Sequence, residues 1–145
     1  MTTNTTHWAH LYVGKPWVSG ARGPDAFDCW GLLWWVKRTH FGVEIPEYSG
    51  VDATNLAVCT GLVDCGSRCG DWEQLLLPLD GCAVGMSKSR RFHHVGVYAE
   101  LDGGLVVHAH DKGNVVAQSV ASLRNAGYGR VEFFQYRHGP RNPDV

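Results

Sequence analysis

A cysteine and two distant histidines are the residues of this chain whose types and spacing could perform nucleophilic chemistry. Cys29 follows a glycine-rich loop and begins an apolar segment with helical spacing. Unpaired backbone N–H groups and the positive end of a helix dipole favour the thiolate, which is the nucleophilic form of cysteine, and the same N–H groups could stabilise an oxyanion. His94 and His108 lie downstream in segments with strand character. There one histidine could accept the thiol proton and a further polar group could orient it.

Each of these residues also has a purely structural interpretation. Most free cysteines are small buried hydrophobic residues, so Cys29 could simply belong to the core. The chain has eight histidines in 145 residues, which makes a chance placement of His94 and His108 plausible. Taken one at a time, the three positions leave both interpretations open.

Clusters of histidine and cysteine raise the alternative of a metal-binding hydrolase. Residues two apart on a strand share a face, so imidazoles could gather as in zinc hydrolases. The histidines concerned are His93, His94, His108 and His110. The other four cysteines are Cys59, Cys65, Cys69 and Cys82, and their spacing includes no Cys-x-x-Cys pair. The chain also lacks a His-Glu-x-x-His motif, so we expect no metal and no other cofactor, and interpret these four cysteines as ordinary thiols.

Composition and charge limit the classes of function. The length of 145 residues suits a single domain over residues 1–145. The net charge is −1, whereas a nucleic-acid-binding protein would carry a basic face, so we expect no nucleic-acid partner. No apolar run reaches the ~18 residues of a membrane span. The opening MTTNTTHWAH has neither the basic nor the apolar region of a secretory signal, and the odd number of cysteines argues against a complete disulfide framework.

A helix and a later run of strands must position the three candidate residues. Residues 14–28 have the glycine and proline content of a loop, and the apolar spacing from Cys29 to His40 predicts a helix buried on most sides, capped by Asp25 or Asp28 and ended by Gly42. A short helix is expected at residues 7–13, and one or two more within residues 51–79. After residue 80, short apolar segments separated by turn residues predict antiparallel strands, so the fold class is α+β.

His94 and His108 lie on segments that would form one hairpin. Side chains that are directly opposed in an antiparallel pair share a face. If the two histidines oppose each other, the hairpin is centred on Leu101 and its loop has an odd number of residues. We therefore expect a loop of three or five residues around Leu101, or a bulge near Gly103, rather than a two-residue turn at Asp102 and Gly103.

Three segments resemble the NlpC family of cell-wall cysteine peptidases. GPDAFDCWGLL resembles that family's Gly-x-Asp-Cys-Ser-Gly-Leu-Val signature, HVGVY and VVHA resemble its His-Val-Gly-Ile-Tyr and Ile-His-Ala pair, and LDGCAVGM stands where it has a Pro-Gly-Asp strand. The segments occur in the family's order over roughly residues 10–118. The resemblance implies a papain-like fold, with N-terminal helices packed on a central antiparallel sheet, and hydrolysis of amide bonds in peptidoglycan stem peptides. It also implies Cys29 as the nucleophile, His94 as the base, and His108 rather than His110 as the orienting residue.

The surroundings of the cysteine are similar to those in NlpC-type proteins of phage tail tips. The shared pattern is Pro-Trp followed by GPDAFDCWGL. This similarity implies a component of a virion tail or phage-like particle that is made in the bacterial cytoplasm without a signal peptide. Its partners would be tail-tip proteins and peptidoglycan stem peptides.

Two positions depart from the family pattern. Trp17 stands where the family often has a tyrosine whose hydroxyl reaches the active site, and Trp30 replaces a serine. With Asp28, these are the residues that we expect to contact substrate. The fourteen-residue spacing of the histidines implies a slightly longer hairpin loop than the family's. The alternative is a structural tail-tip protein that keeps the fold without activity, and the intact nucleophile and histidines argue against it.

Overall fold

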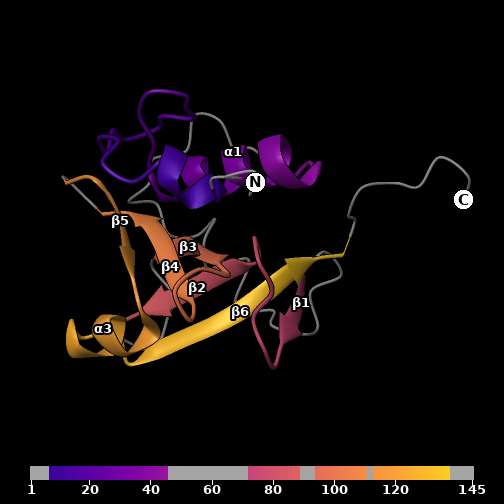
Figure 1. Cartoon of the computed structure of the whole chain (residues 1–145), viewed down its shortest axis with the longest axis vertical. Helices are drawn as coiled ribbons and strands as arrows, with labels where there is room; N and C mark the ends of the chain where they lie inside the picture. The colour runs from indigo at the N-terminus through magenta and orange to yellow at the C-terminus, as the bar shows by residue number, and fades with distance from the viewer. Residues whose placement is uncertain (1–6, 46–71, 89–93, 111–112, 138–145) are drawn as a thin grey trace, which may run out of the picture.

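A six-stranded antiparallel sheet forms the centre of the molecule, with helix α1 (Cys29–Phe41) lying along one side of it (Figure 1). The computed structural model describes residues 7–45, 72–88, 94–110 and 113–137. In their order across the sheet, the strands are β1 (Trp72–Leu75), β6 (Arg130–Tyr136), β2 (Ala83–Ser87), β3 (His94–Ala99), β4 (Leu105–Ala109) and β5 (Val115–Gln118). All neighbouring pairs are antiparallel, which confirms the α+β class.

Among the described residues, two shorter helices accompany the sheet. The 3₁₀ helix η1 (Trp8–Leu11) confirms the short helix expected near the start of the chain. Helix α3 (Val120–Asn125) follows β5 and lies at the opposite side of the sheet from α1 in Figure 1. Within the described residues, none of the helices has both the length and the apolar character needed to cross a bilayer.

Helix α1 begins and ends where the sequence predicts. Its N-cap is Asp28, whose side chain accepts a hydrogen bond from the Gly31 N–H at 2.7 Å and so satisfies an unpaired helix donor. Its C-cap is Gly42, whose φ of 66° is the left-handed conformation that ends many helices. Burial is less complete than expected, because Trp34 and Trp35 remain half-buried.

The sheet has a hydrophobic layer on each face. Odd-numbered positions of β3, such as Val95 and Val97, pack in one cluster with residues of α1. Even-numbered positions face the other way, and Tyr98 packs with Leu123 of α3 in a second cluster. This alternation is the two-residue period of a strand, and it places His94 on the same face as Tyr98.

Two elements differ from the sequence-based expectation. Strand β1 lies in the region where short helices were expected, and it forms because residues 72–75 pair with residues 133–136 of the distant strand β6. The remainder of that expectation, residues 51–71, lies outside the described residues. Helix α3 was not predicted. It begins after Ser119, whose side chain accepts a hydrogen bond from the Ser122 N–H at 3.1 Å.

The β3–β4 hairpin has the expected odd-numbered loop but a shifted centre. Val97 pairs with Val107, and the two strands are joined by the five residues 100–104. The centre is therefore Asp102 rather than Leu101, so the expectation that His94 lies directly opposite His108 is wrong. Asp102 and the two glycines after it all have positive φ, which glycine adopts without strain and which allows the wider turn.

Gly31 marks a close approach between α1 and the loop before it. A Cβ atom at this position would lie 2.0 Å from the carbonyl oxygen of Ala21 and 3.0 Å from Oδ1 of Asp28. Because backbone would have to move, we expect Gly31→Ala to lower the free energy of unfolding by about 3 kcal/mol in urea denaturation. Gly129→Ala is the matched control, since a Cβ there meets open space. Equal destabilisation by the two variants would contradict this interpretation.

Candidate active site

Cys29 is the first residue of α1 and is held there by a buried carboxylate. Its side chain is nearly inaccessible, with 3% of the residue exposed. Asp28 directly before it accepts hydrogen bonds at Oδ1 from the Gly31 N–H and from Nη1 of Arg22 (2.8 Å), and at Oδ2 from the Gly20 N–H (2.9 Å). Burial raises the pKa of Asp28, and these donors act against that shift. The carboxylate therefore ties the glycine-rich loop to the helix start that presents Cys29.

The three residues expected to contact substrate occupy different environments. Asp28 is fully buried and its oxygens are occupied by donors of the chain itself, so its observed role is that of a helix cap. Trp30 is also buried, and its ring packs edge-on against that of Trp72 with 6.3 Å between centroids. Trp17 is half-buried at the edge of the core beneath α1 and keeps part of its side chain accessible.

His94 and His108 are joined by a direct hydrogen bond. Nε2 of His94 lies 2.9 Å from Nδ1 of His108, and the two rings are nearly perpendicular. Both residues are buried, with 8% of His94 and 1% of His108 exposed. Burial, reinforced by the neighbouring His94, lowers the pKa of His108 to about 4. At neutral pH His108 is therefore an uncharged ring with one N–H group and one lone pair.

The two rings meet even though they are not directly opposed in the sheet. Continuing the β3–β4 register places Gly96 across from His108, and a Cβ at Gly96 would lie 3.1 Å from that of His108. His94 is the diagonal neighbour, a separation that long side chains can span. The absence of a side chain at Gly96 leaves the space in which the two rings approach each other.

Residues beyond the predicted set complete the surroundings of this pair. The ring of His94 stacks on Tyr128, with 6.2 Å between centroids, and Nε2 of His108 lies 2.7 Å from Oε1 of Gln118. His110 is exposed, with its ring 6.3 Å from that of His108. Tyr128 and Gln118 could not be predicted from the sequence, because no motif marks them and only the strand pairing brings them to the site.

Cys29 and the histidine pair lie at the same end of the sheet, in different layers. The loop before Cys29 is hydrogen-bonded to the turn after β4, because the Trp17 N–H donates to the Gly113 carbonyl. The Gly113 N–H in turn donates to the His110 carbonyl. This is the end where β3 begins at His94. Cys29 belongs to the cluster beneath α1, whereas the histidines occupy even-numbered positions on the other face. The structure thus joins the two histidines directly, whereas Cys29 lies in the layer on the other face of the sheet.

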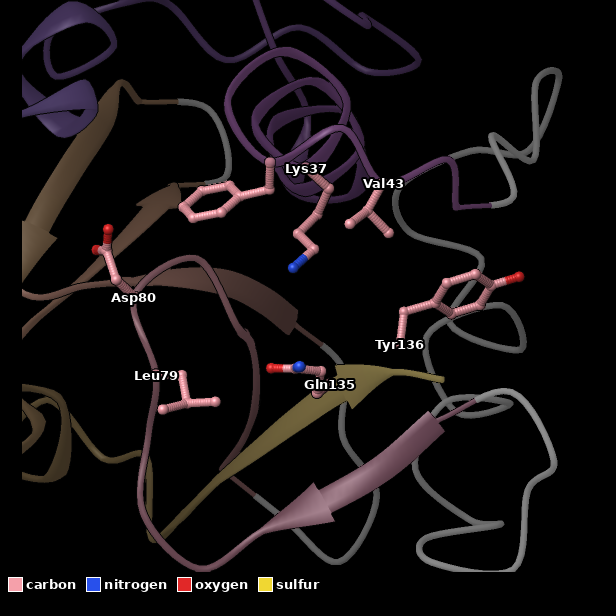
Figure 2. Close-up of a pocket in the computed structure, with 7 residues that line it drawn as sticks. Lys37, Val43, Leu79, Asp80, Gln135 and Tyr136 are labelled. Atoms are coloured by element: carbon pink, nitrogen blue, oxygen red, sulfur yellow. The ribbon is translucent and has the colours of Figure 1, made fainter. Parts of the chain in front are cut away.

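A separate cavity of about 290 Å³ lies at the other end of α1 (Figure 2). Lys37 points its ammonium group into this cavity, and burial lowers its pKa. The walls are formed by Phe41, Val43, Leu79, Asp80, Gln135 and Tyr136. None of the candidate catalytic residues lines it.

Cys82 is the other cysteine that the structure describes, and it is a poor nucleophile. It is completely buried, and burial raises its pKa to about 11, so its thiol stays protonated at neutral pH. Cys59, Cys65, Cys69 and His93 lie outside the described residues. The suggested metal sites would combine these residues with described ones, and among the described residues alone no three His, Cys, Asp or Glu side chains are placed to hold a metal ion.

The low pKa of His108 predicts a pH-dependent stability. In the unfolded chain this histidine takes up a proton near pH 6.5, but in the fold it does so only near pH 4. The unfolded state binds more protons between these values, so the stabilisation is complete above about pH 6.5 and is lost as the pH falls towards 4. The shift corresponds to about 3 kcal/mol. Urea unfolding of the unmodified chain and of His108→Gln, measured across this pH range, should show a steeper loss of unfolding free energy in the unmodified chain. Parallel profiles would contradict the lowered pKa of His108.

The region that contains these residues matches known proteins. Residues 14–137 match the family model of the NlpC/P60 family. The chain is 30% identical over 122 residues to the probable endopeptidase p60 of Listeria grayi, covering 84% of this chain and 20% of that protein. It therefore spans about one fifth of the length of this curated relative.

Solved structures share the fold at low sequence identity. The NlpC/p60 domain of the peptidoglycan hydrolase SagA superposes with a TM-score of 0.54 at 21% identity, over 87% of this chain and 90% of that one. NlpC1 from Trichomonas vaginalis gives a TM-score of 0.57 at 18% identity, over 88% of this chain and 40% of that one. These similarities confirm the expected papain-like arrangement of helices on an antiparallel sheet.

Proposed function

The chain belongs to the NlpC/P60 family, and from this premise we propose that it is a cysteine peptidase that hydrolyses amide bonds in peptidoglycan stem peptides. The observation that carries the proposal is the buried hydrogen bond between His94 and His108, at the end of the sheet where α1 presents Cys29. A general base held by a second polar group, near a cysteine at a helix N-terminus, is the arrangement that activates a thiol.

In the proposed reaction, the Cys29 thiol gives its proton to Nδ1 of His94, the ring nitrogen that the bond to His108 leaves available. The sulfur then attacks the amide carbon, and N–H groups at the start of α1 stabilise the oxyanion. The C–N bond breaks as His94 protonates the departing amine. Water then attacks the thioester, gives a proton to His94, and releases the acid, and the thiolate recovers its proton.

This proposal requires the thiol and the imidazole to meet at the start of β3. His94 is the first residue of that strand, and Val95 directly after it packs in the same cluster as Cys29. The consecutive residues His94 and Val95 therefore link the face that carries the histidines to the layer that contains Cys29. Residues Trp17 and Trp30 remain our proposed substrate contacts, with access to Trp30 requiring movement of the side chains that bury it.

We also propose that the protein acts in the tail tip of a phage or phage-like particle. The support is the Pro-Trp and GPDAFDCWGL pattern around the nucleophile. Purification of particles from a producing strain, followed by detection of this chain in the tail fraction, tests the proposal. Recovery of the chain only from the soluble fraction would contradict it.

One observation favours a second candidate, a structural domain without activity. The near-complete burial of Cys29 and Trp30 is what a packed, silent site would show. Digestion of purified peptidoglycan, with fragments identified by mass spectrometry, separates the candidates. A peptidase releases new stem-peptide fragments, a thiol alkylator stops their release, and a chelator has no effect. A metal hydrolase would show the opposite sensitivities, and a structural protein would release nothing.

A further inference from the structure

Three polar side chains form a diagonal line across neighbouring strands β3, β4 and β5. His108 pairs with Val116, and Val106 pairs with Gln118, so Gln118 lies two positions beyond the partner of His108 on the same face. His94 lies two positions away in the opposite direction on β3. The neighbouring positions of β3, β4 and β5 in the sheet thus align His94, His108 and Gln118 in one hydrogen-bonded row.

The chemistry of the last member determines the direction of each bond. Oε1 of Gln118, 2.7 Å from Nε2 of His108, is a carbonyl oxygen and can only accept. Nε2 of the neutral His108 must therefore carry its proton, which leaves a lone pair on Nδ1. That lone pair accepts the N–H from Nε2 of His94 at 2.9 Å. In the neutral form of His94, Nδ1 then carries no proton, which is the state that a general base needs.

The amide of Gln118 is itself held in place. Its Nε2 group donates to Oγ of Ser122 at 3.1 Å. Ser122 lies in the first turn of α3, where its N–H donates to Oγ of the cap residue Ser119 at 3.1 Å. The reversed amide would present N–H groups to His108 and would require the opposite tautomer in both rings, with a proton on Nδ1 of His94.

We propose that Gln118 is a positioning residue whose carbonyl oxygen selects the Nε2–H tautomer of His108 and thereby keeps Nδ1 of His94 able to accept a proton. The consequence for catalysis rests on the proposed function, whereas the tautomer of His108 does not. Gln118 acts through His108 and is not expected to contact substrate.

The variant that tests the role is Gln118→Met, which keeps the length of the side chain but has no oxygen. Hydrogen-bond partners that orient metal-binding histidines typically contribute ~10–100-fold, and we expect a comparable fall in kcat here with little change in KM. Gln118→Glu retains an acceptor oxygen and should recover most of the lost rate. Gln135→Met, the same change at an exposed position of β6, should leave the rate unchanged.

Nitrogen-15 NMR of the histidine rings, at neutral pH on the full chain, reads the tautomer directly. His108 should carry its proton on Nε2 in the unmodified chain and in Gln118→Glu, and should gain the Nδ1–H form in Gln118→Met. An Nδ1–H tautomer in the unmodified chain would overturn the proposal, as would an unchanged tautomer in a folded Gln118→Met variant. These spectra remain decisive if the chain hydrolyses no peptide, so failure of the proposed function would be recognised separately.

Discussion

Replacing Cys29 with alanine should abolish hydrolysis of peptidoglycan stem peptides, lowering kcat by at least ~10³-fold. The substitution removes the sulfur that forms the acyl bond in the proposed reaction, and the alanine side chain offers no nucleophile in its place. Because Cys29 is a small buried residue at the helix start, alanine fits its space, and the melting temperature should change little. The measurement is the rate of fragment release from purified peptidoglycan, compared at equal concentrations of folded protein.

Cys82→Ala is the matched control for this prediction. It deletes the same kind of group from Cys82, the other described cysteine. Burial keeps the thiol of Cys82 protonated. We expect its rate per folded molecule to equal that of the unmodified chain. A Cys29→Ala rate within tenfold of the unmodified chain would exclude Cys29 as the nucleophile.

The helix that presents Cys29 could be predicted from sequence because its signals are local. The apolar spacing, the Asp28 cap and the terminal Gly42 all lie within the same short segment. Strands β3 and β4 were predicted for the same reason, since turn residues separate two apolar segments. The family resemblance then indicated Cys29, His94 and His108 as the candidate catalytic residues among the cysteines and histidines of the chain.

The pairing of distant segments could not be predicted in this way. Strand β1 owes its conformation to β6, about sixty residues away, and its own sequence reads equally well as a helix. The one-residue shift of the hairpin centre arose from consecutive positive-φ residues at its turn, which a rule based on facing histidines does not capture. Gln118 reaches His108 only through the β4–β5 register, so no local pattern marks it.

Burial also separated residues that the sequence grouped together. Asp28 and Trp30 flank Cys29 and were expected to contact substrate with Trp17. In the fold the carboxylate turns inward to cap α1, and the indole of Trp30 packs against Trp72. Adjacent residues at a helix start point in directions about 100° apart, so proximity in sequence to a nucleophile does not place a side chain in the same cleft.

Replacing His94 with alanine should lower kcat by at least ~10³-fold, because in the proposed reaction this ring accepts the Cys29 proton and returns it to the leaving amine. His108→Ala should cost less, since His94 remains and loses only the ring that orients it. His110→Ala is the matched control: His110 follows β4 closely and carries the same ring, but it is exposed and makes no hydrogen bond to His94 among the described residues.

The order of these three effects distinguishes a catalytic pair from a structural one. If the His94–His108 bond served only packing, loss of the more deeply buried His108 would be the more damaging change, and activity would follow the melting temperature. If His94 is the base, its loss is the most damaging to kcat even when the variant melts like the unmodified chain. Fragment release and thermal unfolding, measured on the same preparations of all three variants, decide between these outcomes. An activity loss in His110→Ala as large as in His94→Ala would contradict the assignment of His94 as the base.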